Sequence, residues 1–131
     1  MIQRHVARLM VLLCFVALCG ACGASTRLKV IRVNVVALNT ARDMVLTLSK
    51  EREKQIYDSC NPPICTKEEG HARVDAWQKK VDVAVKAIDL GYRAQHDAAL
   101  LDDAKSESEA RAAFARALGL VKELKELKEN P

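Results

Sequence analysis

Apolar residues recur every three or four positions along most of this chain, which is the spacing of one face of an α-helix. The first such run covers residues 27–59, and its apolar positions are Leu28, Ile31, Val35, Leu38, Ala41, Val45 and Leu48. Residues 30–36 are rich in β-branched side chains, so a strand is the alternative there. A helix is favoured because the spacing continues through residues 41–58 and no other segment could pair as a strand.

The second helix is predicted from a stop signal and a start signal. Pro62 and Pro63 end the first helix, because proline removes a backbone donor and forces the residue before it toward extended geometry. Thr66 followed by Glu69 has the pattern of a capping box, which opens a helix expected to run to about Asp102. The apolar positions of this helix are Val74, Trp77, Val81, Ala84 and Ile88, with Val85 and Tyr92 beside them.

A third helix is predicted to complete a bundle. Ser106 and Glu109 form a second capping-box pattern. The apolar positions that follow are Phe114, Ala117, Val121 and Leu124, widened by Leu118, Leu120 and Leu127. Gly91, in the middle of the second helix, predicts a close crossing or a bend. The first two helices would each be ~50 Å long and antiparallel across a short loop, and the third would return along them. The sequence therefore predicts an all-α fold, an elongated three-helix antiparallel bundle.

The first 24 residues have the layout of an export signal. Arg4 and Arg8 provide a basic start, residues 9–18 form an apolar core, and residues 19–24 are cysteine, glycine and alanine. Gly20, Ala21 and Cys22, with Leu18 upstream, resemble the lipobox of bacterial lipoproteins.

That resemblance covers residues 1–23 and implies that Cys22 becomes the first mature residue and carries acyl chains. The position three residues before Cys22 is Cys19, where the family usually has leucine. The domain organisation expected is a signal peptide at 1–21, a lipid-anchored linker at 22–26 and a helical bundle at 27–131. Ordinary cleavage after Ala24 and an uncleaved membrane anchor are the alternatives. The anchor stays open because the basic residues at 27, 29 and 32 compete with the start of the chain for the cytoplasmic side.

Export places the remaining cysteines in an oxidising compartment. Of the five cysteines, Cys14 and Cys19 leave with the signal and Cys22 is the lipid acceptor. Cys60 and Cys65 are expected to form a disulfide that pins the tip of the helical hairpin. Free thiols or half of a metal site are the alternatives, although an isolated C-x4-C pair is a poor zinc site.

Composition and charge argue against several functions. The chain has 21 lysine and arginine residues against 17 acidic ones, and removal of the signal leaves a net charge of +2, from 19 basic and 17 acidic residues. Aromatic residues make up 4% of the chain, so a stacking platform for nucleic acid is absent and no nucleic-acid partner is expected. No catalytic motif and no phosphate-binding glycine loop is present, so we expect neither an enzyme nor a cofactor.

The candidate binding residues are few. His71 with Asp75 and His96 with Asp97 lack further ligands, so no metal site is expected and surface pairs are the simpler interpretation. Trp77 lies on the apolar stripe and is either a core residue or an anchor for a protein partner. The residues near the Cys60–Cys65 tip that could contact a partner are Ile64 and Tyr57.

The favoured function is that of a non-catalytic envelope lipoprotein, held by membrane lipid through acylated Cys22 and acting by contact with an envelope protein. Gly23 stands where the lipoprotein family uses aspartate to retain proteins at the inner membrane, so the resemblance implies an outer-membrane location facing the periplasm. One alternative is a phage- or plasmid-type exclusion or immunity lipoprotein that masks a receptor. Another is a periplasmic helical metal sensor or chaperone, whose metal version would use His71 and His96. The sequence leaves the partner and the oligomeric state undetermined.

Overall fold

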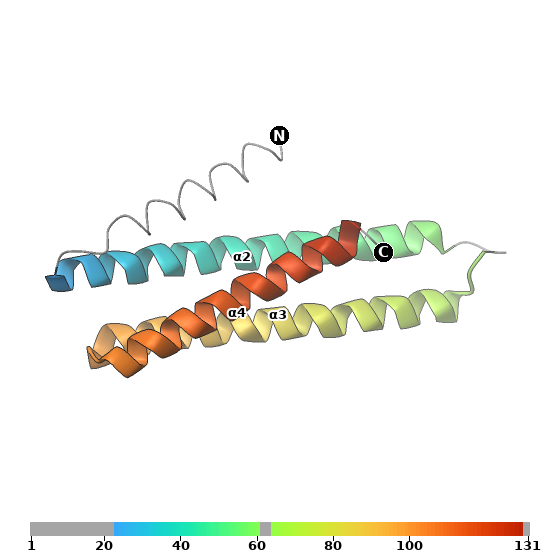
Figure 1. The fold of residues 1–131 in the computed structure, drawn as a ribbon. Helices are drawn as coiled ribbons and strands as arrows, with labels where there is room; N and C mark the ends of the chain where they lie inside the picture. Colours follow the sequence, from blue (N-terminus) through green and yellow to red (C-terminus); the bar gives the residue numbers. More distant parts are fainter. Residues whose placement is uncertain (1–22, 61–63, 130–131) are drawn as a thin grey trace, which may run out of the picture. The chain divides into compact units, whose positions relative to one another are not determined.

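The computed structural model describes residues 23–60 and 64–129, which form three α-helices (Figure 1). These are α2 at Gly23–Ser59, α3 at Lys67–Leu101 and α4 at Ala104–Glu129. The described residues contain no strand, so the all-α expectation is confirmed and the β-branched run at 30–36 is helical. The predicted signal peptide at 1–21 and Cys22 lie outside the described residues. Within them, α2 begins at Gly23, four residues ahead of the predicted start at residue 27.

The chain divides into two compact units, one ending at Val33 and the other beginning at Asn34. The first unit contributes the helical start of α2 from Gly23 onward. The second unit holds the rest of α2 together with α3 and α4, and the packing described below lies within it. Among the residues described, no helix combines the length and the apolar character needed to cross a bilayer.

Contacts between helices in the second unit show their directions. Asn34 hydrogen-bonds Gln95 near one end of the pair formed by α2 and α3, and Gln78 hydrogen-bonds Ser49 further along it. Rising numbers in α2 thus meet falling numbers in α3, so the two helices are antiparallel. Figure 1 shows α4 folding back from the end of α3, and the two helices pack against each other. The predicted antiparallel bundle is confirmed.

Most of the apolar positions predicted from spacing meet in one core, whereas Leu28, predicted on the first stripe, is 47% exposed. Positions taken from all three helices are buried there: Leu38, Ala41, Val45, Leu48, Ile56, Trp77, Val81, Ala84, Ala87, Ile88, Ala117, Val121 and Leu124. Partly buried side chains surround them, namely Val74, Val85, Tyr92, Phe114, Leu118 and Leu120. A single helix cannot shield such a stripe from water, and burying apolar surface contributes about 25 cal/mol per Å². The core is therefore the main source of stability of this unit.

Gly91 marks a close contact between α2 and α3. A Cβ atom added at Gly91 would lie 3.1 Å from Cδ2 of Leu38, a side chain that is fully buried. The absence of a side chain at Gly91 thus makes room for Leu38, and of the two predictions for this glycine the close crossing is the one confirmed.

A polar link crosses the core. Gln95 is 1% exposed, its Oε1 accepts a hydrogen bond of 3.3 Å from Nδ2 of Asn34, and its Nε2 donates one of 3.1 Å to the carbonyl of Ala110. One side chain thereby connects α2, α3 and α4. Nearby, the hydroxyl of Tyr92 donates to Asn39, and partial burial raises the pKa of Tyr92.

The start of α4 corrects one prediction. The proposed capping box of Ser106 and Glu109 is wrong, because α4 begins at Ala104 and Asp103 caps it. The Asp103 carboxylate accepts from the Ser106 backbone N–H at 2.8 Å and from its hydroxyl at 2.7 Å. Asp102 ends α3 with φ of 50°, in the left-handed region that aspartate tolerates better than most residues. A turn of two acidic residues therefore joins the two helices.

Candidate functional site at the disulfide-bridged tip

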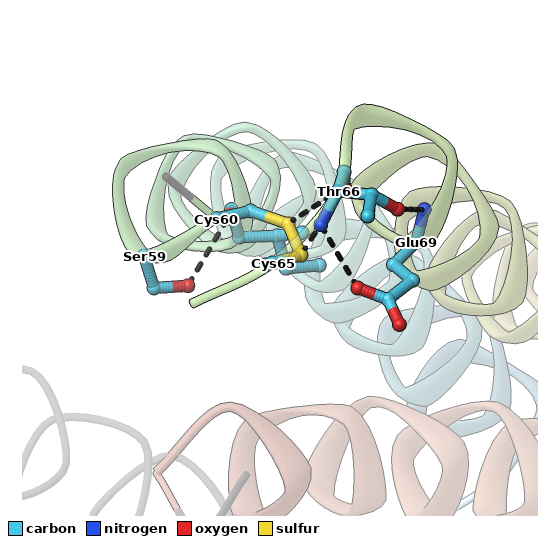
Figure 2. The surroundings of a disulfide bond; sticks show 6 residues. Ser59, Cys60, Cys65, Thr66 and Glu69 are labelled. Atoms are coloured by element: carbon cyan, nitrogen blue, oxygen red, sulfur yellow. Dashed lines mark hydrogen bonds between the residues drawn. A yellow bond between two sulfur atoms is a disulfide. The ribbon is translucent and has the colours of Figure 1, made fainter. Parts of the chain in front are cut away.

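A disulfide joins the end of α2 to the segment before α3. Cys60 and Cys65 are bonded, with their Cα atoms 4.7 Å apart, which confirms the predicted pairing (Figure 2). The backbone N–H of Cys60 donates to the carbonyl of Tyr57 at 3.2 Å and so extends the last turn of α2. We refer to residues 57–60 and 64–71 as the tip.

The capping box predicted at the start of α3 is present. The Glu69 backbone N–H donates to Thr66 Oγ1 at 3.2 Å, and the Thr66 backbone N–H donates to Glu69 Oε2 at 2.9 Å (Figure 2). Each side chain thus satisfies a backbone donor that the helix itself leaves unpaired. Because Thr66 directly follows Cys65, the disulfide and the cap together fix the direction in which α3 leaves the tip.

Gly70 is a tip residue that sequence reasoning missed. It is buried, and a Cβ atom added to it would lie 3.0 Å from the Sγ of Cys60. The first turn of α3 therefore passes close to the disulfide because this position carries no side chain. The available signal was a glycine within the first turn of a helix, shortly after a cysteine, in a chain with only five glycines.

Two of the three candidate contact residues present their side chains at the tip surface. Ile64 is 81% exposed and Tyr57 is 48% exposed. The Tyr57 ring on α2 meets the His71 ring on α3 edge to face, with the ring centroids 6.1 Å apart. This contact joins the two helices at the tip. Trp77 is 5% exposed and belongs to the core, as its place on the apolar stripe indicated. The tip therefore exposes one aliphatic side chain and one aromatic side chain.

The two candidate histidines, His71 and His96, do not lie near each other. His71 and His96 lie 25 residues apart on α3, which is about 37 Å along a helix, so they cannot share one ion. The Nδ1 atom of His96 lies 3.6 Å from a carboxylate oxygen of Asp97, and both side chains are largely exposed. Within residues 23–60 and 64–129, no group of three potential ligands could hold a metal ion. This geometry removes the shared-ion version of the metal-sensor alternative.

Comparison with known proteins gives no match to the chain, whether against protein families, curated proteins or solved structures. Among the described residues, those of the tip form a disulfide-bridged helix junction that displays the apolar side chain of Ile64.

Proposed function

We propose that this protein is a non-catalytic envelope lipoprotein that binds a protein partner through its disulfide-bridged tip. The observation that carries the proposal is the exposure of Ile64, next to Cys65, on a loop whose two ends are covalently joined. A large apolar side chain on a solvent-exposed tip gains free energy when a partner covers it. Since the disulfide already restricts the loop, binding loses less conformational entropy than it would with an open loop.

Membrane attachment is the second part of the proposal and is supported by the sequence. Acylation of Cys22 would hold the protein at a bilayer, because each buried methylene contributes about 0.8 kcal/mol and two or more chains give a lasting anchor. The basic residues at positions 27, 29 and 32 closely follow Cys22 in the chain and suit an anionic headgroup layer. Gly23 supports an outer-membrane location, by resemblance to the lipoprotein family.

The contact role of the tip can be tested by photocross-linking in cells. A photoreactive amino acid replaces Ile64 in one variant and Leu100 in a control variant, where Leu100 is 68% exposed near the opposite end of α3. We expect a discrete cross-linked product from position 64 and none of the same mass from position 100. Equal products at both positions, or none at position 64, would contradict the proposal.

A further inference from the structure

A groove of about 270 Å³ opens beside the tip, between the end of α2, the start of α3 and the end of α4. Its apolar lining includes Ile56 of α2, Ala76 and Trp77 of α3, and Leu127 of α4. Ile56 and Trp77 are buried, whereas Leu127 is 39% exposed. The groove is thus continuous with the hydrophobic core below it and adjoins the tip through the last turn of α2.

Every charged side chain that lines the groove is a cation. These are Arg52 from α2 and Arg73 and Lys80 from α3. Arg52 donates to the amide oxygen of Gln55 at 3.3 Å, and none of the three cations forms an ion pair with a described residue. Lys128 on α4, by contrast, pairs with Glu51. Three cations around an apolar floor, none of them held in an ion pair by a described residue, create a local positive field.

Trp77, which lines the groove, also carries a buried polar group that lacks a partner. The indole N–H of Trp77 is buried and donates to no acceptor in the described part of the chain. Leaving a buried donor unpaired costs about 1–3 kcal/mol.

We propose that the groove binds an acidic segment of the protein partner, in which an apolar side chain is flanked by aspartate or glutamate residues. The apolar side chain would rest against Trp77 and Leu127, and the carboxylates would pair with Arg52, Arg73 and Lys80. Arginine suits this role because its planar guanidinium forms two parallel hydrogen bonds with a carboxylate. The volume lies below the ~300–1,000 Å³ of typical small-molecule pockets, so it fits one or two side chains of a peptide better than a free metabolite.

This inference rests on the proposed function and identifies the chemistry of the partner. The tip would contact the partner through the exposed Ile64. The groove lies a few residues away on α2 and α3 and would select partners by their charge. Charge pairs at the edge of an interface chiefly affect the association rate and the choice of partner, and they weaken with salt.

Binding can be measured with two model peptides and the single tryptophan of the chain. The probes are acetyl-EELFEE-amide and its uncharged counterpart acetyl-QQLFQQ-amide, titrated into the protein as it is purified from cells. Trp77 fluorescence reports occupancy because this side chain lines the groove. We expect the acidic peptide to change Trp77 emission and to bind at least about tenfold more tightly than the uncharged peptide, with the difference shrinking as salt is raised.

A matched pair of charge-reversal variants distinguishes the effect of the groove cations on binding from the effect of the net charge of the protein. The groove variant carries Arg52→Glu, Arg73→Glu and Lys80→Glu, and it should weaken binding of the acidic peptide at least about tenfold. The control variant makes the same change in net charge at exposed cations elsewhere, namely Lys86→Glu, Arg93→Glu and Arg116→Glu. It should alter binding by less than about twofold. Far-UV circular dichroism of both variants verifies that the helices are intact.

The inference is overturned if neither peptide binds at up to about 1 mM, if both bind equally, or if the control variant loses binding as the groove variant does. These outcomes are distinct from failure of the proposed function. If position 64 still cross-links to a partner while the groove variant behaves as the unmodified protein, the groove inference fails and the contact role of the tip stands. If cross-linking at position 64 fails, the proposed function fails whatever the peptides do.

Discussion

Two helical glycines of this protein sit in opposite environments. At Gly91 an added Cβ would press on the buried Leu38 at 3.1 Å, whereas at Gly119 it would meet no atom within 4 Å. The intrinsic cost of glycine in a helix, ~1 kcal/mol relative to alanine, applies at both positions. Only the surroundings differ, so the pair isolates the effect of close packing between α2 and α3.

Gly119→Ala is expected to raise the free energy of unfolding by about 1 kcal/mol, because alanine has a higher helix propensity than glycine and the added methyl group clashes with no other atom. Gly91→Ala should instead lower it, because overpacking a filled core costs about 1–3 kcal/mol and exceeds the gain in helix propensity. Urea denaturation of the two variants measures both values. An equal stabilisation by both substitutions would show that α2 and α3 do not approach as described.

Gln95 is the residue whose role is least visible in the sequence. It occupies a position on the inward face of α3, seven residues after Ile88, where an apolar side chain would be expected. Its side-chain amide accepts a hydrogen bond from Asn34 on α2 and donates one to the Ala110 carbonyl on α4. These two hydrogen bonds fix the alignment of the three helices relative to one another. Buried polar side chains of this kind favour one alignment over others, at some cost in stability.

Gln95→Leu is expected to lower the free energy of unfolding by about 1–3 kcal/mol, because Asn34 remains buried without its acceptor. The double variant Asn34→Leu with Gln95→Leu should recover most of that loss, since no unpaired donor remains. A double-mutant cycle by urea denaturation gives the coupling free energy between the two positions. Additive losses from Asn34→Leu and Gln95→Leu would mean that the two side chains do not interact.

At the scale of the helices, the N-terminus of α4 depends on one carboxylate. Hydrogen bonds from the Ser106 hydroxyl and backbone N–H hold the pKa of Asp103 below its ordinary value. The folded state therefore prefers the ionised form. The resulting stabilisation is fully present above the pKa of an unfolded aspartate, about 3.9, and is lost as the pH falls through the lower pKa of the folded state.

Asp103→Asn keeps a side-chain acceptor at this cap but removes the titrating charge. The difference in thermal stability between the unmodified protein and this variant is expected to favour the unmodified protein at pH 7 and to shrink below about pH 4. Melting curves recorded by circular dichroism from pH 7 to pH 2 give the comparison. A difference that does not change with pH would contradict the role of the ionised carboxylate.

For the molecule as a whole, the disulfide acts at one end of the bundle. It spans a sequence separation of five, so the chain-entropy model limits its contribution to at most about 2 kcal/mol. Cys60→Ser should leave helix content near that of the unmodified protein, while amide hydrogen exchange accelerates at residues 64–71. Hydrogen exchange by mass spectrometry measures this, with the far end of α3 as the internal reference. Faster exchange throughout the bundle would mean that the disulfide supports the whole fold.

The fold of this protein is largely predictable from its sequence, because helix spacing, Pro62 and Pro63, and the capping box at Thr66 are local signals. The start of α4 was missed because Asp103 and Ser106 are both good capping residues and sequence alone does not choose between neighbouring turns. The groove was missed for a different reason. Its cations come from separate helices, and only tertiary packing brings Arg52 together with Arg73 and Lys80.

We propose that the protein is a membrane-anchored lipoprotein. The measurement that tests it most directly is the intact mass of the protein from the membrane fraction of its native cells, alongside a Cys22→Ser variant. We predict a chain that begins at Cys22 and carries acyl chains, and a variant that loses acylation and membrane attachment. An unmodified chain that begins after Ala24, or an uncleaved chain of full length, would contradict it.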